Sequence, residues 1–255
     1  MTGIFADEET VASNQATVTS SAKMPVTLVL LPGMDGTSIL FEPFIAAFGD
    51  RYPVSVVQYP TTSHSQTYAA LHDFATAHLP AGGSIVLLGE SFSGPIAISI
   101  AAANPVRVLG VILCCTFVRN PRPKLRWLKS LAYLPTPRPP LPIANALLLG
   151  RFATPKLRAL LRNALHKVQP AVLRARLREV VSVDVRAQAV KLVMPVLYLQ
   201  ALNDQLVPPS AVAEAQQLCR DMEVEVFDAP HCLLQVVPVE ASDAVLHFID
   251  RLVAT

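Results

Sequence analysis

The sequence predicts an α/β fold in which a mostly parallel, doubly wound sheet is interrupted by an inserted helical segment. Short apolar runs alternate with stretches of helical periodicity in two parts of the 255-residue chain, before Val118 and after Met194. Strands that alternate with helices form right-handed crossovers and therefore a parallel sheet. Between the two parts only helical patterns occur. With 52% hydrophobic and 16% charged residues, the chain can bury a sizeable core and is not of the disordered class.

The first part predicts four strands, each a short aliphatic run that ends in turn residues. The strands span 26–31, 54–58, 85–88 and 108–115, and the helices between them span 41–48, 65–78 and the run that ends at Ala103. The second part predicts strands at 196–200 and 223–227, the latter edge-like, and helices at 209–218 and 238–252. Residues 1–24, rich in Ala, Ser and Thr, are expected to form a flexible tail.

Residues 119–190 differ from both flanking parts. A proline-rich stretch is followed, from Ala144 to Arg178, by leucines interleaved with arginines, which predicts two or three amphipathic helices. An insertion between two strands of a parallel sheet can lie over the carboxyl ends of the strands, where ligands bind in open α/β sheets. We therefore expect a core formed by residues 25–118 and 191–255, and a helical cap, or lid, formed by residues 119–190.

A serine stands at a tight predicted corner of the core. The segment Gly-Glu-Ser-Phe-Ser-Gly, residues 89–94, joins the strand 85–88 to the helix that follows. A strand-to-helix turn of this kind exposes the hydroxyl of its central serine, here Ser91, and the helix amino terminus directs N–H groups towards negative charge beside it. Small residues must flank the serine, and Gly89 and Ser93 take those positions. Because one motif match is weak evidence, Ser91 needs partners.

A base and an acid follow at two later strand ends. His231 lies four residues after the predicted strand 223–227, and Asp204 lies four residues after the strand 196–200. A nucleophilic serine needs a base to remove its proton, and a histidine base needs a carboxylate to fix its tautomer. Loops at the carboxyl ends of adjacent parallel strands lie side by side. We therefore predict that Ser91, Asp204 and His231 form a catalytic triad.

Neighbouring titratable groups fit these roles less well. Asp228 is the alternative acid, but its position at the end of the same strand as His231 favours a role in shaping that turn. Glu90, beside the serine, is assigned no catalytic role. The other five histidines lie in predicted helices, in the cap or in a polar loop: His64, His72, His78, His166 and His247.

A tetrahedral oxyanion at Ser91 would need about two aligned N–H donors. In this geometry one donor belongs to the residue after the serine, Phe92, and the other to a loop after an earlier strand. The turn Pro32-Gly33-Met34 follows the first predicted strand, so the Met34 N–H is the second expected donor, and Gly33 allows close approach. Taken alone, the same residues are explained equally well by an ordinary Pro-Gly turn.

Together these motifs resemble the α/β-hydrolase superfamily over residues 25–252. Gly-Glu-Ser-Phe-Ser-Gly resembles its nucleophile elbow, Leu-Pro-Gly-Met-Asp-Gly-Thr its oxyanion loop, Asn-Asp-Gln-Leu-Val-Pro its acid loop and Ala-Pro-His-Cys-Leu-Leu-Gln its histidine loop. Within the superfamily the chain is most similar to small intracellular carboxylesterases such as the pimeloyl carrier-protein methyl ester esterases. The oxyanion loop also resembles that of plant phytyl ester synthase-type acyltransferases. Ser93 replaces the usual final glycine, and the missing N-terminal hairpin predicts a trimmed sheet.

The resemblance implies an α/β-hydrolase fold and a serine hydrolase of the carboxylesterase type, EC 3.1.1.-, that cleaves esters of apolar acyl groups. We expect apolar cap and loop residues to line the acyl pocket: Gly33, Met34, Phe92, Trp127, Leu147 and Leu233. Two alternatives stay open, an acyltransferase that passes the acyl group to an alcohol and a ligand receptor without turnover. No metal or organic cofactor is implied.

Charge is divided unevenly between the cap and the core. Residues 119–191 hold 16 Lys and Arg and two acidic residues, a net charge of +14, whereas the rest of the chain carries −12. The arginines either form a solvated face or attract an acidic carrier protein or an anionic membrane surface. The expected contacts are Arg151, Arg158, Arg162, Arg174, Arg176 and Arg178. Nucleic acid is not expected, because the core is acidic and no recognition motif is present.

The remaining features concern the cellular compartment. The four cysteines have neither metal-ligand spacing nor a disulfide-dense pattern, so we expect buried thiols in a reducing compartment. The N-terminus lacks the basic start and apolar centre of a secretion signal, and no apolar run reaches the roughly 20 residues of a membrane-spanning helix. We therefore expect a cytoplasmic protein without a transmembrane segment.

Overall fold

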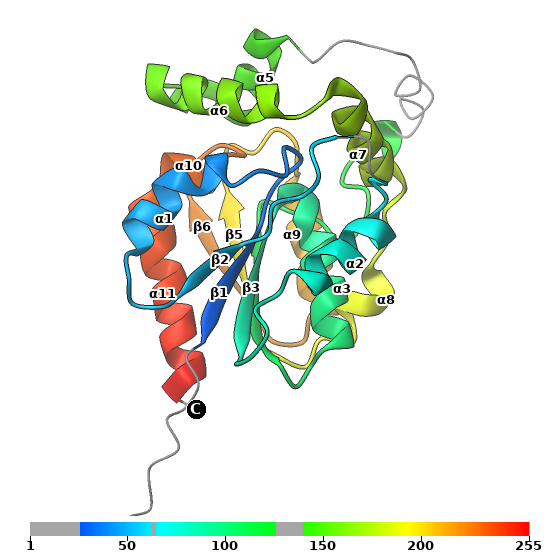
Figure 1. Cartoon of the computed structure of the whole chain (residues 1–255), viewed down its shortest axis with the longest axis vertical. Helices are drawn as coiled ribbons and strands as arrows, with labels where there is room; N and C mark the ends of the chain where they lie inside the picture. The colour runs from blue at the N-terminus through cyan, green and yellow to red at the C-terminus, as the bar shows by residue number, and fades with distance from the viewer. Residues whose placement is uncertain (1–25, 63–64, 126–139, 255) are drawn as a thin grey trace, which may run out of the picture.

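Six parallel strands form a single sheet in the computed structural model, which describes residues 26–62, 65–125 and 140–254 (Figure 1). The strands are β1 (Thr27–Leu31), β2 (Val54–Val56), β3 (Ile85–Glu90), β4 (Val108–Cys114), β5 (Val196–Ala201) and β6 (Met222–Phe227). Their order in the sheet is β2-β1-β3-β4-β5-β6. Every pairing between these strands is parallel, and β6 lies at an edge as predicted. The predicted N-terminal tail lies outside the described residues.

Helices cover both faces of the sheet and its upper end (Figure 1). One face carries α1 (Glu42–Phe48), α10 (Leu233–Val236) and α11 (Pro238–Ala254), and the other carries α2 (Tyr68–Ala77), α3 (Gly94–Ala103), α8 (Arg186–Ala189) and α9 (Pro209–Leu218). Above the sheet lie α5 (Leu141–Leu148), α6 (Pro155–Lys167) and α7 (Pro170–Ser182). Short 3-10 turns occupy Ile39–Phe41, Ser91–Ser93, Pro123–Leu125 and Gly150–Phe152.

Strand β3 shows why these residues form a central strand. All six of its residues are buried, because α3 covers one face of the sheet there and α1 and α11 cover the other. A strand buried on both faces needs a continuous apolar run, and Ile85–Leu88 supplies one. Helix α3 is apolar on nearly every side for the same reason, since the sheet, α2 and α8 enclose it.

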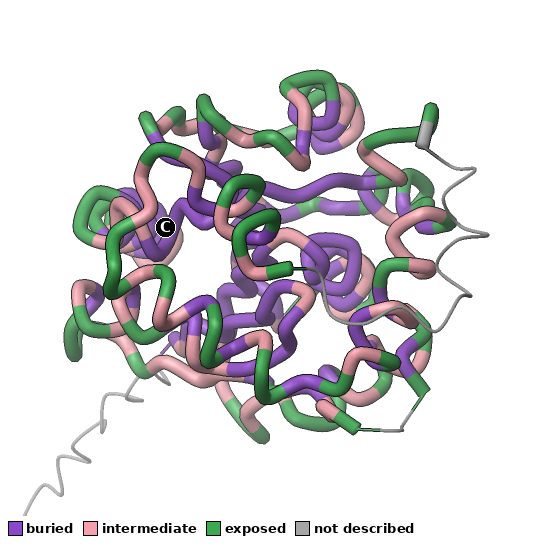
Figure 2. Tube along the Cα trace, turned by 90° about the horizontal axis from the view of Figure 1, so that it is seen from above, coloured by how far each residue is buried: buried purple, intermediate pink, exposed green. Residues whose placement is uncertain are grey.

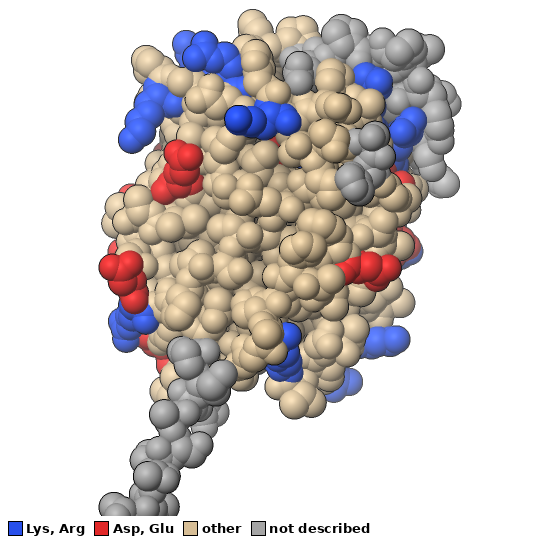
Figure 3. Space-filling model, viewed as in Figure 1, with Lys and Arg blue, Asp and Glu red and all other residues tan. Residues whose placement is uncertain are grey.

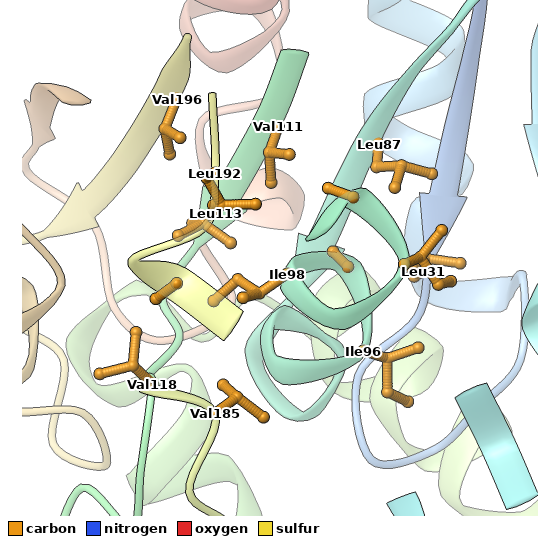
Figure 4. Close-up of a cluster of buried hydrophobic side chains, with 14 of the residues drawn as sticks. Leu31, Leu87, Ile96, Ile98, Val111, Leu113, Val118, Val185, Leu192 and Val196 are labelled. Atoms are coloured by element: carbon orange, nitrogen blue, oxygen red, sulfur yellow. The ribbon is translucent and has the colours of Figure 1, made fainter. Parts of the chain in front are cut away.

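Apolar side chains fill the two spaces between the sheet and its helices. Figure 4 shows the cluster on the α3 side, where Leu87 and Val111 of the sheet face Ile98 of α3. Figure 2 shows buried residues concentrated in the sheet and in the inner sides of the surrounding helices. Val185, near the end of the predicted cap, and Leu192, just after it, belong to the same cluster. The division into core and cap at residues 118 and 191 stays a prediction.

The order of the strands indicates where on the sheet a ligand would bind, namely at the carboxyl ends of the strands. From β1 the chain crosses to β2 on one side and then returns to β3 on the other side of β1. The loops that follow β1 and β3 therefore leave neighbouring strands in opposite directions, which is the arrangement at which open α/β sheets bind ligands. Helices α5, α6 and α7 lie above this edge (Figure 1). The sequence did not predict α10, a four-residue helix that begins two residues after His231.

Candidate active site

The turn after β3 holds Ser91 in a strained conformation. Ser91 has φ of 50°, a left-handed value that a residue with a side chain rarely adopts. The turn is tight, because a Cβ on Gly89 would lie 2.8 Å from the Ser93 carbonyl oxygen and one on Gly94 would overlap the Thr116 side chain. The Thr116 hydroxyl also donates a hydrogen bond to the Ser91 carbonyl oxygen. Neighbouring atoms therefore approach the backbone most closely at Gly89 and Gly94, where only glycine fits. Position 93 tolerates the side chain of serine.

Ser91, His231 and Asp204 form a continuous hydrogen-bonded chain. His231 Nε2 lies 2.8 Å from Ser91 Oγ, and His231 Nδ1 lies 2.8 Å from Asp204 Oδ2. The side chains of His231 and Asp204 are 6% and 4% exposed. Three loops at the carboxyl ends of β3, β5 and β6 thus bring together the three residues predicted from the sequence, and His231 is positioned to accept the Ser91 proton.

Backbone donors hold the Asp204 carboxylate in place. Its Oδ1 atom accepts hydrogen bonds from the N–H groups of Leu206 and Val207, at 2.8 and 2.9 Å, which leaves Oδ2 for His231. The alternative acid, Asp228, is instead exposed and accepts hydrogen bonds from Asn203 and Arg151. The carboxylate next to His231 is therefore Asp204.

The loop after β1 runs beside the elbow. Its turn closes with a 3.0 Å hydrogen bond from the Gly36 N–H to the Gly33 carbonyl oxygen, and Gly36 has φ of 71°. The Ser93 hydroxyl donates to the Pro32 carbonyl oxygen and so ties the elbow to this loop. Met34 lines the same cavity as Ser91. Both predicted oxyanion donors, the N–H groups of Met34 and Phe92, thus belong to segments that are held beside Ser91.

Aromatic contacts hold Phe92 itself. The Tyr68 hydroxyl donates a 3.0 Å hydrogen bond to the Phe92 carbonyl oxygen, and the two rings stack with centroids 4.8 Å apart. The Phe92 side chain is 1% exposed and packs in the core cluster. The sequence predicted that the Phe92 side chain lines the acyl pocket. That prediction is wrong, because the side chain is buried in the core.

A cavity of about 530 Å³ connects Ser91 with the helices above it. It is lined at the bottom by Gly33, Met34 and His231, and half of its lining residues come from α5, α6 and α7, nearly all of them apolar. The apolar residues from these helices are Ile143, Ala144, Leu147, Leu148, Leu161, Leu165, Pro170, Leu173 and Leu177. A concave, largely apolar site with a few polar groups at one end is typical of pockets for small apolar ligands.

Two other residues that were expected in the pocket, Leu233 and Trp127, are not seen there. Leu233 is fully buried in the core cluster between α1 and α11, so it cannot line the cavity. The neighbouring Cys232 lines it instead. The prediction failed because Leu233 belongs to α10, whose apolar side faces the core. Trp127 lies outside the described residues.

Glu90 is a buried acid directly beside the nucleophile. Its Oε1 atom accepts a 2.9 Å hydrogen bond from Gln235 Nε2, whereas Oε2 has no hydrogen-bond partner among the described residues. Burial raises the pKa of Glu90 to about 7, and the nearby Asp35 carboxyl adds to the shift, against the Gln235 hydrogen bond. Because the protonated form is neutral, it adds no negative charge at the site.

The basic residues of the cap take different positions. Arg158 and Arg162 are exposed on α6, Arg151 pairs with Asp228 at 2.7 Å, and Arg174 lines the cavity. Arg178 is partly buried. Figure 3 shows several Lys and Arg side chains at the cap end of the visible face, and further Lys and Arg lower on it together with Asp and Glu.

Arg176 is the exception, because it is buried, and the prediction that it contacts a partner is wrong. Its side chain is 0% exposed, so it cannot contact a partner protein or membrane. Helical periodicity carried the missed signal, because Arg176 lies four residues after Val172 and three after Leu173, on the buried side of α7. Arg174 and Arg178 lie two residues away on either side and therefore on another face of the helix.

Comparison with known proteins shows the family of the chain. A model described as the alpha/beta hydrolase family matches residues 28–246. The chain belongs to the α/β-hydrolase family. A search of curated proteins finds no match.

Solved structures resemble this α/β-hydrolase at low identity, which shows the fold alone. An esterase from Exiguobacterium antarcticum has a TM-score of 0.76 at 14% identity, covering 88% of this chain and 91% of its own. A thermophilic esterase from Thermogutta terrifontis has a TM-score of 0.75 at 21% identity, covering 89% and 90%. An enol-lactonase from Burkholderia xenovorans LB400 has a TM-score of 0.68 at 17% identity, covering 91% and 92%.

Two further properties concern only the residues that the structure describes. No helix among them is long and apolar enough to cross a membrane. Their His, Cys, Asp and Glu side chains form no group of three or more that could hold a metal ion. All four cysteines are free and buried, as predicted: Cys114, Cys115, Cys219 and Cys232.

Proposed function

We propose that this α/β-hydrolase is a serine carboxylesterase that cleaves esters of apolar acyl groups. The observation that carries the proposal is the chain of two 2.8 Å contacts from Asp204 through His231 to Ser91, at the base of an apolar cavity. A hydroxyl paired with an oriented imidazole is the arrangement that activates serine for attack on a carbonyl carbon.

The reaction follows from the positions of these groups. Ser91 Oγ attacks the ester carbonyl carbon while His231 Nε2 takes its proton, and the carbonyl oxygen becomes an oxyanion beside the Met34 and Phe92 N–H groups. His231 then gives the proton to the leaving alcohol, which leaves an acyl-enzyme. Water, deprotonated by His231, releases the carboxylic acid and restores Ser91. Asp204 keeps Nδ1 protonated and stabilises the imidazolium in both steps.

The cavity supports an apolar acyl chain as the part of the substrate that is bound. Leucines and alanine of α5 and α6 line the space above Ser91, and Arg174 of α7 is the one charged side chain that these helices contribute to the lining. Burial of each methylene contributes about 0.8 kcal/mol, which is about a fourfold gain in kcat/KM until the cavity is full.

Hydrolysis of p-nitrophenyl esters of increasing acyl length tests this proposal. We expect kcat/KM to rise with acyl length to an optimum and the Ser91→Ala variant to be inactive throughout. Equal rates for the two proteins would refute the assignment. Product analysis with added alcohols separates hydrolysis from acyl transfer, and covalent labelling without turnover would favour the receptor alternative.

We also propose that the basic cap delivers the acyl chain from an acidic carrier protein or an anionic surface, as the resemblance to carrier-protein methyl ester esterases suggests. Arg158 and Arg162 support this because they are exposed one turn apart on α6, beside a cavity whose mouth has exposed apolar residues such as Ile143 and Leu177. Attraction between a basic surface and an acidic partner weakens as salt is added, so charge reversal on α6 tests the proposal.

A further inference from the structure

Arg176 is a charged side chain of the cap that lies in the interior of the molecule. It extends from α7 and is among the largest side chains with no exposed surface. Burial lowers the pKa of its guanidinium to about 10, so it still carries its charge near neutral pH. A buried ion loses several kcal/mol of hydration, and an apolar side chain of similar size would avoid that loss. The position therefore requires an explanation other than packing.

The guanidinium bridges two loops of the core, the one after β1 and the one between β2 and α2. Nε donates to Gln66 Oε1 at 2.8 Å, Nη1 donates to the Met34 carbonyl oxygen at 2.8 Å, and Nη2 donates to the Pro60 carbonyl oxygen at 3.0 Å. A guanidinium presents five N–H donors in a fixed plane, which is why one side chain can hold acceptors from three directions. A lysine at this position would offer a single nitrogen.

The same group touches both segments that carry the proposed oxyanion donors. On the side of the β1 loop it donates to Met34 and fits against Gly36, where a Cβ would overlap Nη1. On the side of the elbow it lies 6.0 Å from the centroid of the Phe92 ring, and Tyr59 lies beneath it at 5.5 Å. Fixing the Met34 carbonyl restricts rotation of that residue and hence the direction of its N–H group.

We propose that Arg176 is a positioning residue. Through it the cap holds the oxyanion loop so that the Met34 N–H group points towards the oxyanion site beside Ser91. The inference rests on the proposed function, because it assumes that the Met34 N–H stabilises an oxyanion on a substrate bound to Ser91. It assigns α7 a part in the chemical step in addition to its part in the cavity wall. Loss of the guanidinium weakens stabilisation of the transition state while leaving the acyl cavity open.

Steady-state kinetics on a soluble short-chain ester tests this with Arg176→Met and Arg176→Lys. Removal of one oxyanion donor lowers kcat by about 10² to 10³. Because misplacement is milder than removal, we expect Arg176→Met to lower kcat about 10- to 100-fold with little change in KM. Arg176→Lys should recover part of that loss.

The matched control is Gln66→Met, which removes the 2.8 Å hydrogen bond to Arg176 Nε and leaves the contact with Met34. Both substitutions should lower Tm, but Gln66→Met should keep kcat close to that of the wild type. If the two variants lose kcat in equal measure, Arg176 acts only through stability and the inference is wrong.

Binding of an alkylboronic acid supplies a second measurement that does not depend on turnover. A boronate bound to Ser91 is tetrahedral and places an oxygen in the oxyanion site, whereas the product carboxylic acid does not. We expect Arg176→Met, or Arg176→Lys if the first variant does not fold, to weaken boronate binding as much as kcat/KM while the product binds as before. Unchanged boronate affinity in a folded variant would overturn the inference.

Failure of the inference can be distinguished from failure of the proposed function. If wild-type protein has esterase activity that requires Ser91, and folded Arg176 variants retain kcat, only the inference fails. If wild-type protein neither hydrolyses esters nor binds the boronate, the proposed function fails, and the inference fails with it.

Discussion

The core and the cap bury their residues to very different extents. All six residues of β3 are buried, whereas α6 in the cap buries only Leu161 and Ala164 of its 13 residues (Figure 2). The proposed reacting groups follow strands whose backbone is fixed by hydrogen bonds to neighbouring strands. The apolar wall of the cavity belongs to helices that are exposed on one side. We propose on this basis that the core fixes the chemistry and that the predicted cap determines which acyl group reaches it.

Asp204→Asn should show the largest effect, because it alters the chemistry of the core and leaves the cap intact. The amide can no longer hold His231 in the tautomer that accepts the Ser91 proton, and the corresponding change in a serine protease lowers kcat about 10⁴-fold. We expect a fall of similar size in ester hydrolysis with nearly unchanged acyl-length preference. Asp228→Asn is the matched control, since its carboxylate is exposed and bonds to Arg151 instead; a comparable loss there would contradict the assignment.

Glu90→Gln removes a titrating acid from the core and should therefore reduce the pH dependence of the free energy of unfolding. Burial raises the pKa of Glu90 to about 7 from the ordinary 4.5, so the folded state binds the proton more tightly than the unfolded state does. The free energy of unfolding therefore falls as pH rises between about 4.5 and 7, by about 3 kcal/mol in total. Urea unfolding at pH 5 and pH 8 should show this loss in the wild type and a smaller one in Glu90→Gln. Identical losses in both proteins would contradict the assigned pKa.

Leu147→Trp should change selectivity through the cap while sparing the core. Leu147 lines the cavity from α5, and a larger side chain there leaves less room for the acyl chain. For each methylene excluded, kcat/KM should fall about fourfold on long esters, with the acetyl ester unaffected. Val193→Trp, at an exposed position outside the cavity, is the control. A uniform loss across all acyl lengths would show that the cap wall does not select chain length.

The double reversal Arg158→Glu and Arg162→Glu should have the smallest effect on the enzyme itself. Both side chains are exposed on α6, so a soluble short-chain ester should be hydrolysed at the wild-type rate. Hydrolysis of an ester carried by an acidic protein or by an anionic vesicle should fall severalfold at low salt, and the difference should shrink at high salt. An equal effect on both kinds of substrate would contradict the proposal that the cap attracts an acidic carrier protein or an anionic surface.

The sequence predicted which loops lie together at the strand ends better than it predicted which helical side chains are buried, and the reason is physical. The proximity of Ser91, Asp204 and His231 could be predicted because the loops that follow parallel strands lie at the same end of the sheet. Leu233 was placed in the pocket because a four-residue helix has too short a pattern to show which side faces the core. Arg176 was counted with the exposed arginines because its burial depends on acceptors from loops about 110 to 140 residues earlier in the chain.

Covalent labelling with an alkyl fluorophosphonate, followed by peptide mass analysis, tests the central claim most directly. We expect one phosphonyl group per chain, attached to Ser91, with loss of ester hydrolysis in step with labelling and no labelling of Ser91→Ala. Absence of labelling, attachment to another residue, or hydrolysis that persists in fully labelled protein would contradict it.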